Sequence, residues 1–472
     1  MIEDLVVCKL TNFKEEKMKR FWLVMLALGL TLAFSAQAFA VDVKFSGSFY
    51  AAGMYMDKTT LSNRTNGSDN VSTAFYYQRL RVQTDFIVAP GLTLITRIDA
   101  MERAWGAPRS TAGTALDTGS AGTVAENENI AFDWAYISYD SPIGTFRAGY
   151  MDAVVWGTAF ADSSTPLPTL AWLKTTGPWY YFVKIFKGTE NSYTAKNTGA
   201  TATDIDKDKY GAGVKYSWNG GEAGLLTAIV REATKRQSEN YKGFWYELNP
   251  YAKAQLGPVK VQAEVYYAWG EMKKFDSGIG DIKLENLGIF LDAVADFNMF
   301  YAGGTFAYIS GDDPTTTDKS EGGTVVNGGR DWNPCLIMFN YYDRTYWAGN
   351  LAGNGTSNAG PMGNDATTYS SASGVGFPGA WFGQGRIGVR PITALDIMAS
   401  LSYAKADQKP STILNSAFGW EVDVTGTYKI TNNLSYMMGV GYWFVGDYYK
   451  GSSNDNAVQN NYMLINKLTL TF

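Results

Sequence analysis

Apolar and polar side chains alternate along most of this chain, and the alternation is clearest between residues 75 and 89. There the even-numbered positions are mostly apolar, whereas the odd-numbered positions from Arg79 to Asp85 are charged or carry an amide. Because successive side chains of a β-strand point to opposite faces, this pattern predicts a strand with one apolar and one polar face. Similar segments recur to the end of the chain, where the last one finishes on Phe472.

The connections between these segments predict the number of strands. Eight of them are short and contain turn residues, as at 89–91 and 219–221, whereas those in between are long and polar, as at 105–128 and 311–377. Eight short turns imply nine hairpins and therefore 18 strands. With an even number of antiparallel strands, the first strand begins and the last strand finishes at the same end of the sheet. Sixteen strands is the alternative, because 165–175 contains two prolines, which are poor strand formers. The predicted strands are 42–56, 72–89, 91–104, 129–141, 143–152, 165–175, 178–187, 207–218, 221–233, 241–256, 258–271, 282–296, 298–310, 378–390, 392–406, 415–430, 432–447 and 458–472.

Alternation alone fits either a soluble β-sandwich or a transmembrane barrel. Many segments run 12 residues or more, against about five or six in globular proteins. Short turns alternating with long loops are typical of the periplasmic and extracellular ends of an outer-membrane barrel. We therefore predict an all-β fold, a transmembrane antiparallel β-barrel of about 18 strands over residues 41–472, with long extracellular loops of which 311–377 is the longest. The aromatic residues that we assign to its interfacial girdles are Trp134, Tyr136, Trp179–Phe182, Trp269, Trp381, Trp420 and Tyr442–Phe444.

The long apolar run near the start predicts export. Met18-Lys19-Arg20 is followed by the apolar stretch 21–34 and by Ala38-Phe39-Ala40. A basic start, a short apolar core and a small-residue cleavage site define a secretory signal peptide, and this core is too short to span a bilayer as a helix. We assign residues 18–40 to the signal peptide, with cleavage after Ala38 as the alternative, and residues 1–17 to a misassigned N-terminal extension.

Composition excludes several kinds of function. Residues 1–40 hold five basic and four acidic residues, so the mature part keeps 35 Lys and Arg against 41 Asp and Glu, which gives no basic footprint for nucleic acid. The chain contains no histidine, on which haem ligation, most catalytic zinc sites and Ser-His hydrolysis depend. Cys335 is the lone cysteine of the mature part and reads as a small buried apolar residue. We expect no enzyme activity, no cofactor and no metal site.

The export signal, the rhythm of hairpins and the last strand with its terminal Phe472 resemble the outer-membrane porins of Gram-negative bacteria. That resemblance implies an outer-membrane location among lipid and lipopolysaccharide, a homotrimer, and recognition of Phe472 by the barrel assembly machinery. Residues 134–160 and 331–350 also look like porin-type proteins of sulfate- and metal-reducing bacteria. Residues 79–106 are similar to alginate-export barrels, although those carry a basic lumen, whereas this chain is mildly acidic.

The polar face of the strands supplies the candidate pore-lining residues. They are Arg79, Arg81, Arg97, Asp99, Asp133, Arg147, Glu264, Asp292, Arg386, Arg390, Glu421 and Asp423. Bases on one wall and acids on another would bias which ions enter, whereas Arg–Asp pairs would merely stabilise the wall, and alternation leaves both open. Two loops are candidates for narrowing the bore: 152–164, with Asp152 and Asp162, and 311–377, whose apolar and aromatic islands need cover in the lumen or against a neighbouring subunit.

These features favour a passive outer-membrane pore for small hydrophilic solutes and ions, because a barrel of this size leaves an aqueous channel. Two alternatives remain at this stage. The first is a substrate-specific channel for acidic sugars or small organic acids. The second is a structural barrel that sheathes or anchors a surface partner such as a multihaem cytochrome. The chain contains neither CxxCH nor histidine, so it cannot bind haem in that way itself.

Overall fold

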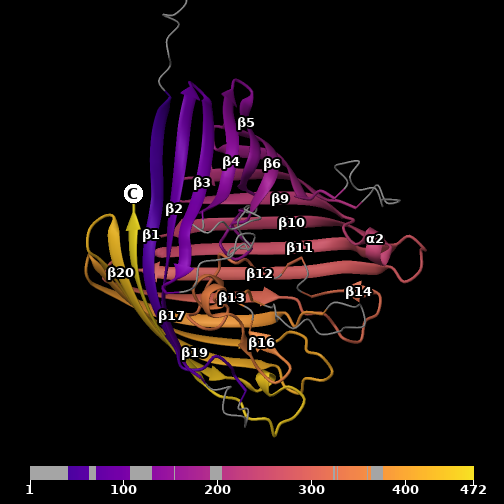
Figure 1. The fold of residues 1–472 in the computed structure, drawn as a ribbon, viewed down its shortest axis with the longest axis vertical. Helices are drawn as coiled ribbons and strands as arrows, with labels where there is room; N and C mark the ends of the chain where they lie inside the picture. The colour runs from indigo at the N-terminus through magenta and orange to yellow at the C-terminus, as the bar shows by residue number, and fades with distance from the viewer. Residues whose placement is uncertain are drawn as a thin grey trace, which may run out of the picture.

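Eighteen long antiparallel strands form one sheet that closes into a barrel (Figure 1). The computed structural model describes residues 41–62, 71–106, 130–153, 155–191, 205–322, 325–326, 328–358, 360–362 and 376–472. The extension at 1–17 and the signal peptide at 18–40 that the sequence predicts lie outside these residues. The barrel strands are β1 (Asp42–Met56), β2 (Thr73–Ala89), β3 (Leu92–Ala104), β4 (Ile130–Ser141), β5 (Gly144–Asp152), β6 (Pro166–Thr176), β7 (Trp179–Thr189), β8 (Lys207–Trp218), β9 (Gly221–Glu232), β10 (Tyr241–Leu256), β11 (Val259–Phe275), β12 (Ile282–Asp296), β13 (Phe300–Ile309), β17 (Ala380–Ile392), β18 (Leu395–Lys405), β19 (Ala417–Lys429), β20 (Leu434–Val445) and β21 (Asn461–Thr471).

The first and last strands close the sheet. β1 pairs with β2 on one side and with β21 on the other, both antiparallel, so neither edge of the sheet is left open. Phe472 continues this closure, because its carbonyl accepts a hydrogen bond from the Gly47 N–H at 2.8 Å and its own N–H donates to the Gly47 carbonyl at 3.1 Å. The expected number of 18 strands and the closed antiparallel barrel are therefore confirmed.

The strand at 165–175, which left 16 strands as an alternative, is present as β6 despite its two prolines. Pro166 and Pro168 lie in the part of β6 that pairs with β5, ahead of Thr169, where pairing with β7 begins. A proline cannot donate to a ladder and is tolerated where one side of the strand is unpaired. The position of the two prolines at this half-paired start explains why the strand survives.

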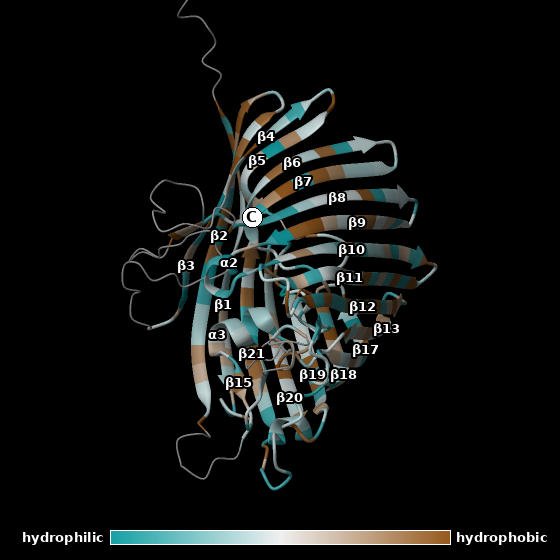
Figure 2. Ribbon diagram, turned by 90° about the vertical axis from the view of Figure 1, so that its right-hand side faces the viewer, coloured by the Kyte–Doolittle hydropathy of each residue, from teal (hydrophilic) through white to brown (hydrophobic). Residues whose placement is uncertain are grey.

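The two faces of the sheet are the reverse of those of a soluble protein. On β19 the exposed side chains are apolar, with Trp420, Val422 and Val424 at 48%, 39% and 46%, whereas Glu421 and Asp423 between them are buried at 0% and 2%. Brown and paler or teal bands alternate along many strands in the same way (Figure 2). An apolar outer face around a polar inner face is the arrangement of a barrel that crosses a membrane.

Aromatic side chains cluster near strand ends on the outer face, but four of the expected girdle residues lie on the inner face instead. They are Trp134, Tyr136, Phe182 and Trp443, of which Phe182 and Trp443 are 4% and 0% exposed. The rings of Trp179 and Tyr216 pack at a tilt at the turn end, with centroids 4.8 Å apart. The assignment of Trp134 and Tyr136 to a girdle was wrong, because both face the lumen. A β-bulge opposite Arg97, where the register shifts, brings two successive residues of β4 to the inner face.

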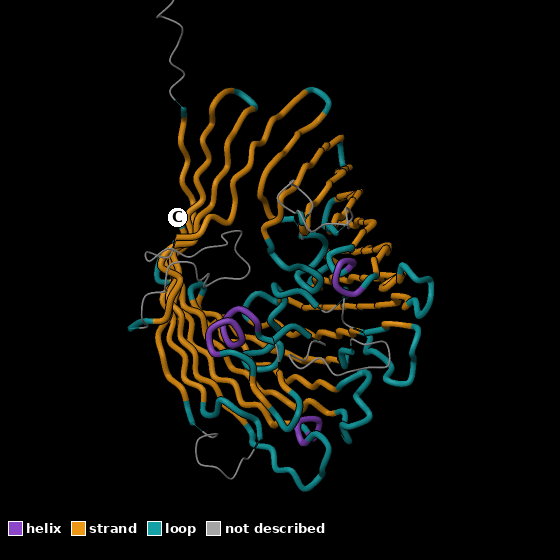
Figure 3. Tube along the Cα trace, turned by 45° about the vertical axis from the view of Figure 1, so that its right-hand side comes forward, coloured by secondary structure: helices purple, strands orange, loops and turns teal. Residues whose placement is uncertain are grey.

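Two connections at the loop end, from β5 to β6 and from β13 to β17, fold inward, so their loop and helical turns lie inside the ring of strands (Figure 3). The longest runs from β13 to β17 and carries β14 (Lys319–Ser320), the π-helical turn η1 (Tyr341–Thr345), α3 (Tyr346–Ala348), β15 (Leu351–Ala352) and β16 (Ser357–Asn358). The other short elements are α2 (Arg236–Glu239) and η2 (Asp447–Lys450). Within the described part of the chain, no helix has the length and apolar character needed to cross a membrane.

Candidate functional site

The loop between β5 and β6, residues 153–165, crosses towards the wall formed by β10 to β12. Its Thr158 N–H donates to Glu264 of β11 at 2.9 Å, and the Thr158 hydroxyl donates to the same carboxylate. The ring of Phe160 stacks on Phe290 of β12, with centroids 5.1 Å apart. Gly157 has a φ of 72°, and a Cβ there would lie 2.8 Å from Glu264. Glycine therefore allows both the turn and the close approach to the wall.

The second loop is anchored further along the wall, on β17 and β19. The successive N–H groups of Ile337 and Met338 donate to the two oxygens of Glu421 on β19, each at 2.6 Å. Phe339 packs edge-on against Phe382 of β17, with ring centroids 6.0 Å apart. Hydrogen bonds to a carboxylate are stronger than those between neutral groups, so Glu421 fixes this segment inside the barrel. Of the two packings expected for the apolar island, the structure has the one within the lumen.

Arg344 organises the same segment from within. Its guanidinium is fully buried and donates to the carbonyls of Ile337 at 2.9 Å, Gly349 at 3.0 Å and Asn358 at 3.3 Å, and also to the Asn358 side chain. Burial lowers the pKa of Arg344 to about 10, so the side chain still carries its charge at neutral pH. Three segments of the loop are thereby held by one side chain.

The two loops meet in the lumen. The Gly329 N–H donates to the Phe160 carbonyl at 2.6 Å, and the Asp331 N–H donates to the Asp162 carbonyl at 3.1 Å. The Asp331 carboxylate accepts hydrogen bonds from the N–H of Ser164 at 3.0 Å and from its hydroxyl at 2.7 Å. These contacts join the two loops into one body that spans the bore.

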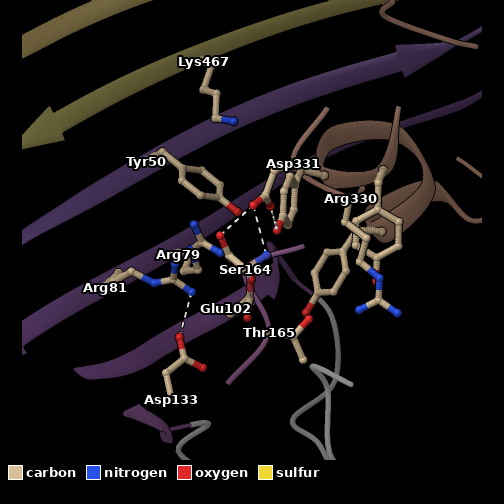
Figure 4. Close-up of a pocket in the computed structure, with 13 residues that line it drawn as sticks. Tyr50, Arg79, Arg81, Glu102, Asp133, Ser164, Thr165, Arg330, Asp331 and Lys467 are labelled. Carbon is tan, nitrogen blue, oxygen red and sulfur yellow. Dashed lines mark hydrogen bonds and ion pairs between the residues drawn. The ribbon is translucent and has the colours of Figure 1, made fainter. Parts of the chain in front are cut away.

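A cavity of about 250 Å³ remains between the joined loops and the wall formed by β1 to β4 and β21 (Figure 4). Its lining combines arginines, carboxylates and tyrosines, and Arg79 and Arg81 face Asp331 and Ser164 across it. The full lining is Tyr50, Arg79, Arg81, Glu102, Asp133, Ser164, Thr165, Arg330, Asp331, Tyr341, Tyr342, Tyr346 and Lys467. This polar cavity within the bore is the candidate functional site.

Four of the sequence-predicted residues form one ion-pair cluster on the wall of this cavity. Arg81 contacts Asp99 at 2.5 Å and Asp133 at 2.8 Å, and Arg97 contacts Asp133 at 2.9 Å. The Arg97 guanidinium also lies 3.6 Å from the centre of the Trp134 ring, a cation–π contact that the bulge in β4 makes possible. Alternation placed all four on the inner face, and the pairing of adjacent strands brings them together.

A second group of predicted residues is paired elsewhere on the wall. Arg386 on β17 contacts Asp292 on β12 at 2.7 Å across β13. Arg390 contacts Asp296 at 3.0 Å and Asp396 at 2.9 Å at the turn end of the barrel. The sequence left two arrangements open, opposed walls of charge and paired Arg–Asp ladders. These contacts are Arg–Asp pairs.

Three arginines are less neutralised than these. The nearest acid to Arg79 is Glu102 at 3.5 Å, and its Nε has no hydrogen-bond partner among the described residues. Arg147 and Arg330 form no ion pair within the described part of the chain. Instead, their guanidinium groups lie 5.8 Å from the ring centre of Tyr136 and 4.7 Å from that of Tyr341. Positive charge is thus available near the cavity although most charges are paired.

Three predicted pore-lining acids lie on the inner face beneath the loops. Glu264, Glu421 and Asp423 are 1%, 0% and 2% exposed. The two constriction-loop candidates lie at the end of β5 and in the loop that follows it. Asp152, the last residue of β5, is partly buried and its Oδ1 has no hydrogen-bond partner among the described residues, whereas Asp162 accepts a hydrogen bond from the Trp156 N–H at 2.6 Å.

Asp162 is the titratable group of the loop that is most changed by its surroundings. Burial is the main cause and raises its pKa to about 8. The nearby charges of Glu264 and Asp331 also raise the pKa, whereas the hydrogen bond from the Trp156 N–H lowers it. An isolated aspartate is ionised well below neutral pH. Asp162 is therefore largely protonated at neutral pH and gains its charge in mildly alkaline conditions.

Several cavity residues were not predicted from the sequence. Arg330, Asp331 and Tyr342 lie in the long loop, which has no period from which a direction can be read. Lys467 and Tyr50 lie on the inner faces of β21 and β1, where alternation alone does not distinguish them from their neighbours. Tyr342 and Asp331 are themselves hydrogen bonded at 2.6 Å. The aromatic island at 341–347 was the available signal, because so many rings in a loop need cover.

Comparison with known proteins agrees with this architecture. OccK9 (OpdG) of Pseudomonas aeruginosa has a TM-score of 0.50 at 14% identity, with 91% of this chain and 99% of that chain covered. A BenF-like porin of Pseudomonas fluorescens Pf-5 has a TM-score of 0.49 at 11% identity, over 91% and 99%. The anion-selective porin of Comamonas acidovorans has a TM-score of 0.42 at 12% identity, over 91% and 99%. No family model matches the chain, and no curated protein matches it by sequence.

The fold defines the class of protein. A closed antiparallel barrel with an even number of strands, an apolar outer face, short turns at one end and long loops at the other is that of the bacterial outer membrane. The chain is an outer-membrane β-barrel with the architecture of porins, and several of its structural neighbours are named as porins or as an outer membrane channel. At such low identity the likeness concerns the fold alone.

Proposed function

We propose that this chain is a passive outer-membrane pore for small hydrophilic solutes and ions, with the joined loops as its constriction. The observation that carries the proposal is the polar cavity between these loops and the ion-paired wall of β1 to β4. A barrel of 18 strands is wide enough for water, and two inward loops that leave a polar gap narrow it without making it apolar. Charged and hydroxyl-bearing linings favour hydrated solutes over lipids.

A second candidate is a substrate-specific channel for acidic sugars or small organic acids. Arg79, Arg330 and Lys467 line the cavity together with Tyr341, Tyr342 and Tyr346. Arginine binds carboxylates in a bidentate manner, and tyrosine offers both a ring face and a hydroxyl. Because Arg330 forms no ion pair within the described residues, a carboxylate solute would find a free guanidinium there. This lining supports a preference for anions within the pore.

Single-channel recording in planar bilayers tests the two candidates. A conductance that rises linearly with salt and is insensitive to added organic acids supports the general pore. Block by a class of small acids at millimolar concentration, with an anion-selective reversal potential in asymmetric salt, supports the specific channel. A purified, folded barrel without conductance would contradict both and would favour a structural role.

The alternative of a barrel that sheathes a partner receives less support. A sheath needs an unobstructed bore, whereas the described loops of this chain occupy the bore and contact each other and the wall. Purification of the barrel only in association with a cytochrome would restore that alternative.

The remaining proposals concern export and assembly. We propose cleavage of a signal peptide at 18–40, assembly through the terminal Phe472 by the barrel assembly machinery, and a homotrimer in contact with outer-membrane lipid and lipopolysaccharide. Phe472 is half exposed beside β1, which supports a role in recognition by another protein. Phe472→Ala should refold normally in detergent but reach the outer membrane less well, whereas equal failure in both assays would indicate a structural role.

We also propose that the chain belongs with the porin-type proteins of sulfate- and metal-reducing bacteria that residues 134–160 and 331–350 resemble.

A further inference from the structure

Cys335 of the long loop lies against two carboxylates of the wall. Its Sγ, one oxygen of Glu421 and one oxygen of Asp423 all lie within 4.8 Å of one another. The three side chains are 4%, 0% and 2% exposed. Glu421 and Asp423 are two residues apart on β19 and therefore share its inner face. A thiol and two carboxylates thus converge in a site shielded from solvent.

The hydrogen bonds of the two carboxylates leave one oxygen without a partner. The oxygens of Glu421 accept the N–H groups of Ile337 and Met338, and Asp423 Oδ2 accepts long hydrogen bonds from the Leu336 N–H at 3.4 Å and the Ser400 hydroxyl at 3.5 Å. Asp423 Oδ1, however, is buried and accepts no hydrogen bond from a described N–H or hydroxyl group, so only a proton shared with Glu421 would pair it. A buried carboxylate oxygen without a partner is costly.

The backbone leaves space next to that oxygen. Gly441 of β20 lies directly opposite Asp423 in the sheet. A Cβ at Gly441 would lie 2.7 Å from Asp423 Oδ1 and 3.5 Å from Glu421 Oε1. Any other residue at 441 would therefore crowd the Asp423 carboxylate. The glycine keeps the side of the site towards β20 open.

The negative charge of the site also lacks a direct partner. Within the described part of the chain, no lysine or arginine forms an ion pair with Glu421 or Asp423. Arg344 is the buried cation of the same segment, but its hydrogen bonds go to carbonyl groups and to Asn358. Two buried carboxylates need a counter-charge, either a shared proton or a metal cation. The thiol provides a third donor that a shared proton would not require.

We propose that Cys335, Glu421 and Asp423 form a binding site for a zinc-like divalent cation that clamps the long loop to β19. Zinc is borderline soft and is bound by cysteine sulfur and carboxylate oxygen together, with a water molecule completing four ligands. Binding converts the Cys335 thiol to a thiolate, and the proton passes to the solvent. The site is independent of the solute that the pore conducts, because it lies behind the loop rather than in the cavity.

Metal stoichiometry on the full-length refolded barrel tests the proposal. The protein is refolded in detergent with ZnCl₂, separated from free metal and analysed by elemental analysis and native mass spectrometry, and a parallel sample is refolded with CoCl₂. We expect one zinc per chain and, with cobalt, the absorption of a thiolate ligand. Refolding with the metal present is needed because the site is buried once the loop is in place.

The variants Cys335→Ser and Asp423→Asn distinguish a site from adventitious binding. Each should lose the bound zinc or weaken its affinity by at least about tenfold, and Cys335→Ser should abolish the cobalt–thiolate absorption. Asp313→Asn, an exposed acid of the same loop, is the matched control and should bind as the wild type does. Strand content by circular dichroism shows whether each variant folds. If Asp423→Asn does not fold, the zinc binding of Cys335→Ser alone decides the test. No stoichiometric zinc on the folded wild-type barrel, or unchanged binding in Cys335→Ser, would overturn the proposal and leave a proton shared by the two acids.

Discussion

Asp331 and Ser164 are 167 residues apart in sequence, and together they hold the two inward loops to each other. The Asp331 carboxylate accepts both the N–H and the hydroxyl of Ser164, and it also accepts the hydroxyl of Tyr342 at 2.6 Å. The constriction is therefore a joint structure of two loops, and its width depends on a contact between them as much as on either loop.

Asp331→Ala should loosen this constriction. Hydrogen bonds to a charged group contribute about 1.5–3 kcal/mol each, and the variant leaves the Ser164 N–H without its acceptor. We expect a higher and noisier single-channel conductance with no change in the strand content of the barrel. Ser164→Ala is the matched control, because it removes one of the two hydrogen bonds and should have a smaller effect. A conductance trace identical to that of the wild type would show that the contact does not set the width.

Arg344→Ala should release the long loop while the barrel remains closed. The substitution leaves the buried carbonyls of Ile337 and Asn358 without the guanidinium that they accept from, at about 1–3 kcal/mol for each group. Hydrogen exchange followed by mass spectrometry should show faster exchange in 334–350 and unchanged exchange in β17 to β21. Arg344→Lys keeps the charge but not the planar fork and should be intermediate. Faster exchange throughout the barrel would instead assign Arg344 to the stability of the whole fold.

The ion selectivity of the pore should depend on pH through Asp162. Its pKa is about 8 in the folded protein because of burial, against about 3.9 for a free aspartate. The carboxyl is neutral well below pH 8 and becomes negative above it, so selectivity should shift towards cations between pH 7 and 9. Reversal potentials in a KCl gradient measure this shift, and Asp162→Asn should abolish it.

The same pKa fixes the sign of a stability effect. A carboxyl that is harder to ionise in the folded state destabilises that state when ionisation is forced. The contribution of Asp162 to the free energy of unfolding is therefore most favourable below about pH 4. It declines as the pH rises towards 8 and is constant above that. Urea unfolding of the barrel in detergent at several pH values should show a smaller decline in Asp162→Asn than in the wild type.

Arg330→Ala should shift the pore towards cations. Arg330 lines the cavity and lies over the Tyr341 ring without an ion pair among the described residues, so its removal deletes a charge without leaving an acid unpaired. We expect a more cation-selective reversal potential and, if small organic acids block the channel, a block weakened by about tenfold, which corresponds to about 1.4 kcal/mol. Lys235→Ala, exposed next to α2, controls for net charge. Equal shifts in both variants would contradict a local role.

The sequence predicted the barrel well because its strands are long and regular. Alternation with a period of two placed Arg81, Asp99 and Asp133 on one face, and the order of the hairpins made their strands neighbours. It failed where the period breaks, as at the bulge in β4 that turns Trp134 inward. It could not show that Asp331 meets Ser164 or that Ile337 meets Glu421, because loops have no period and their partners are distant in sequence.

The pairing of β1 with β21 has a consequence for how the molecule can be made. The two edges that must meet are at opposite ends of the described chain, with Ser48 opposite Thr471. Contacts so distant in sequence are slow to form, because the chain loses much entropy in closing the loop before the new contacts contribute any favourable free energy. Until they form, the nascent sheet has two unsatisfied edges that invite aggregation. We therefore expect the unclosed sheet to aggregate readily and the pairing of β1 with β21 to remove that hazard.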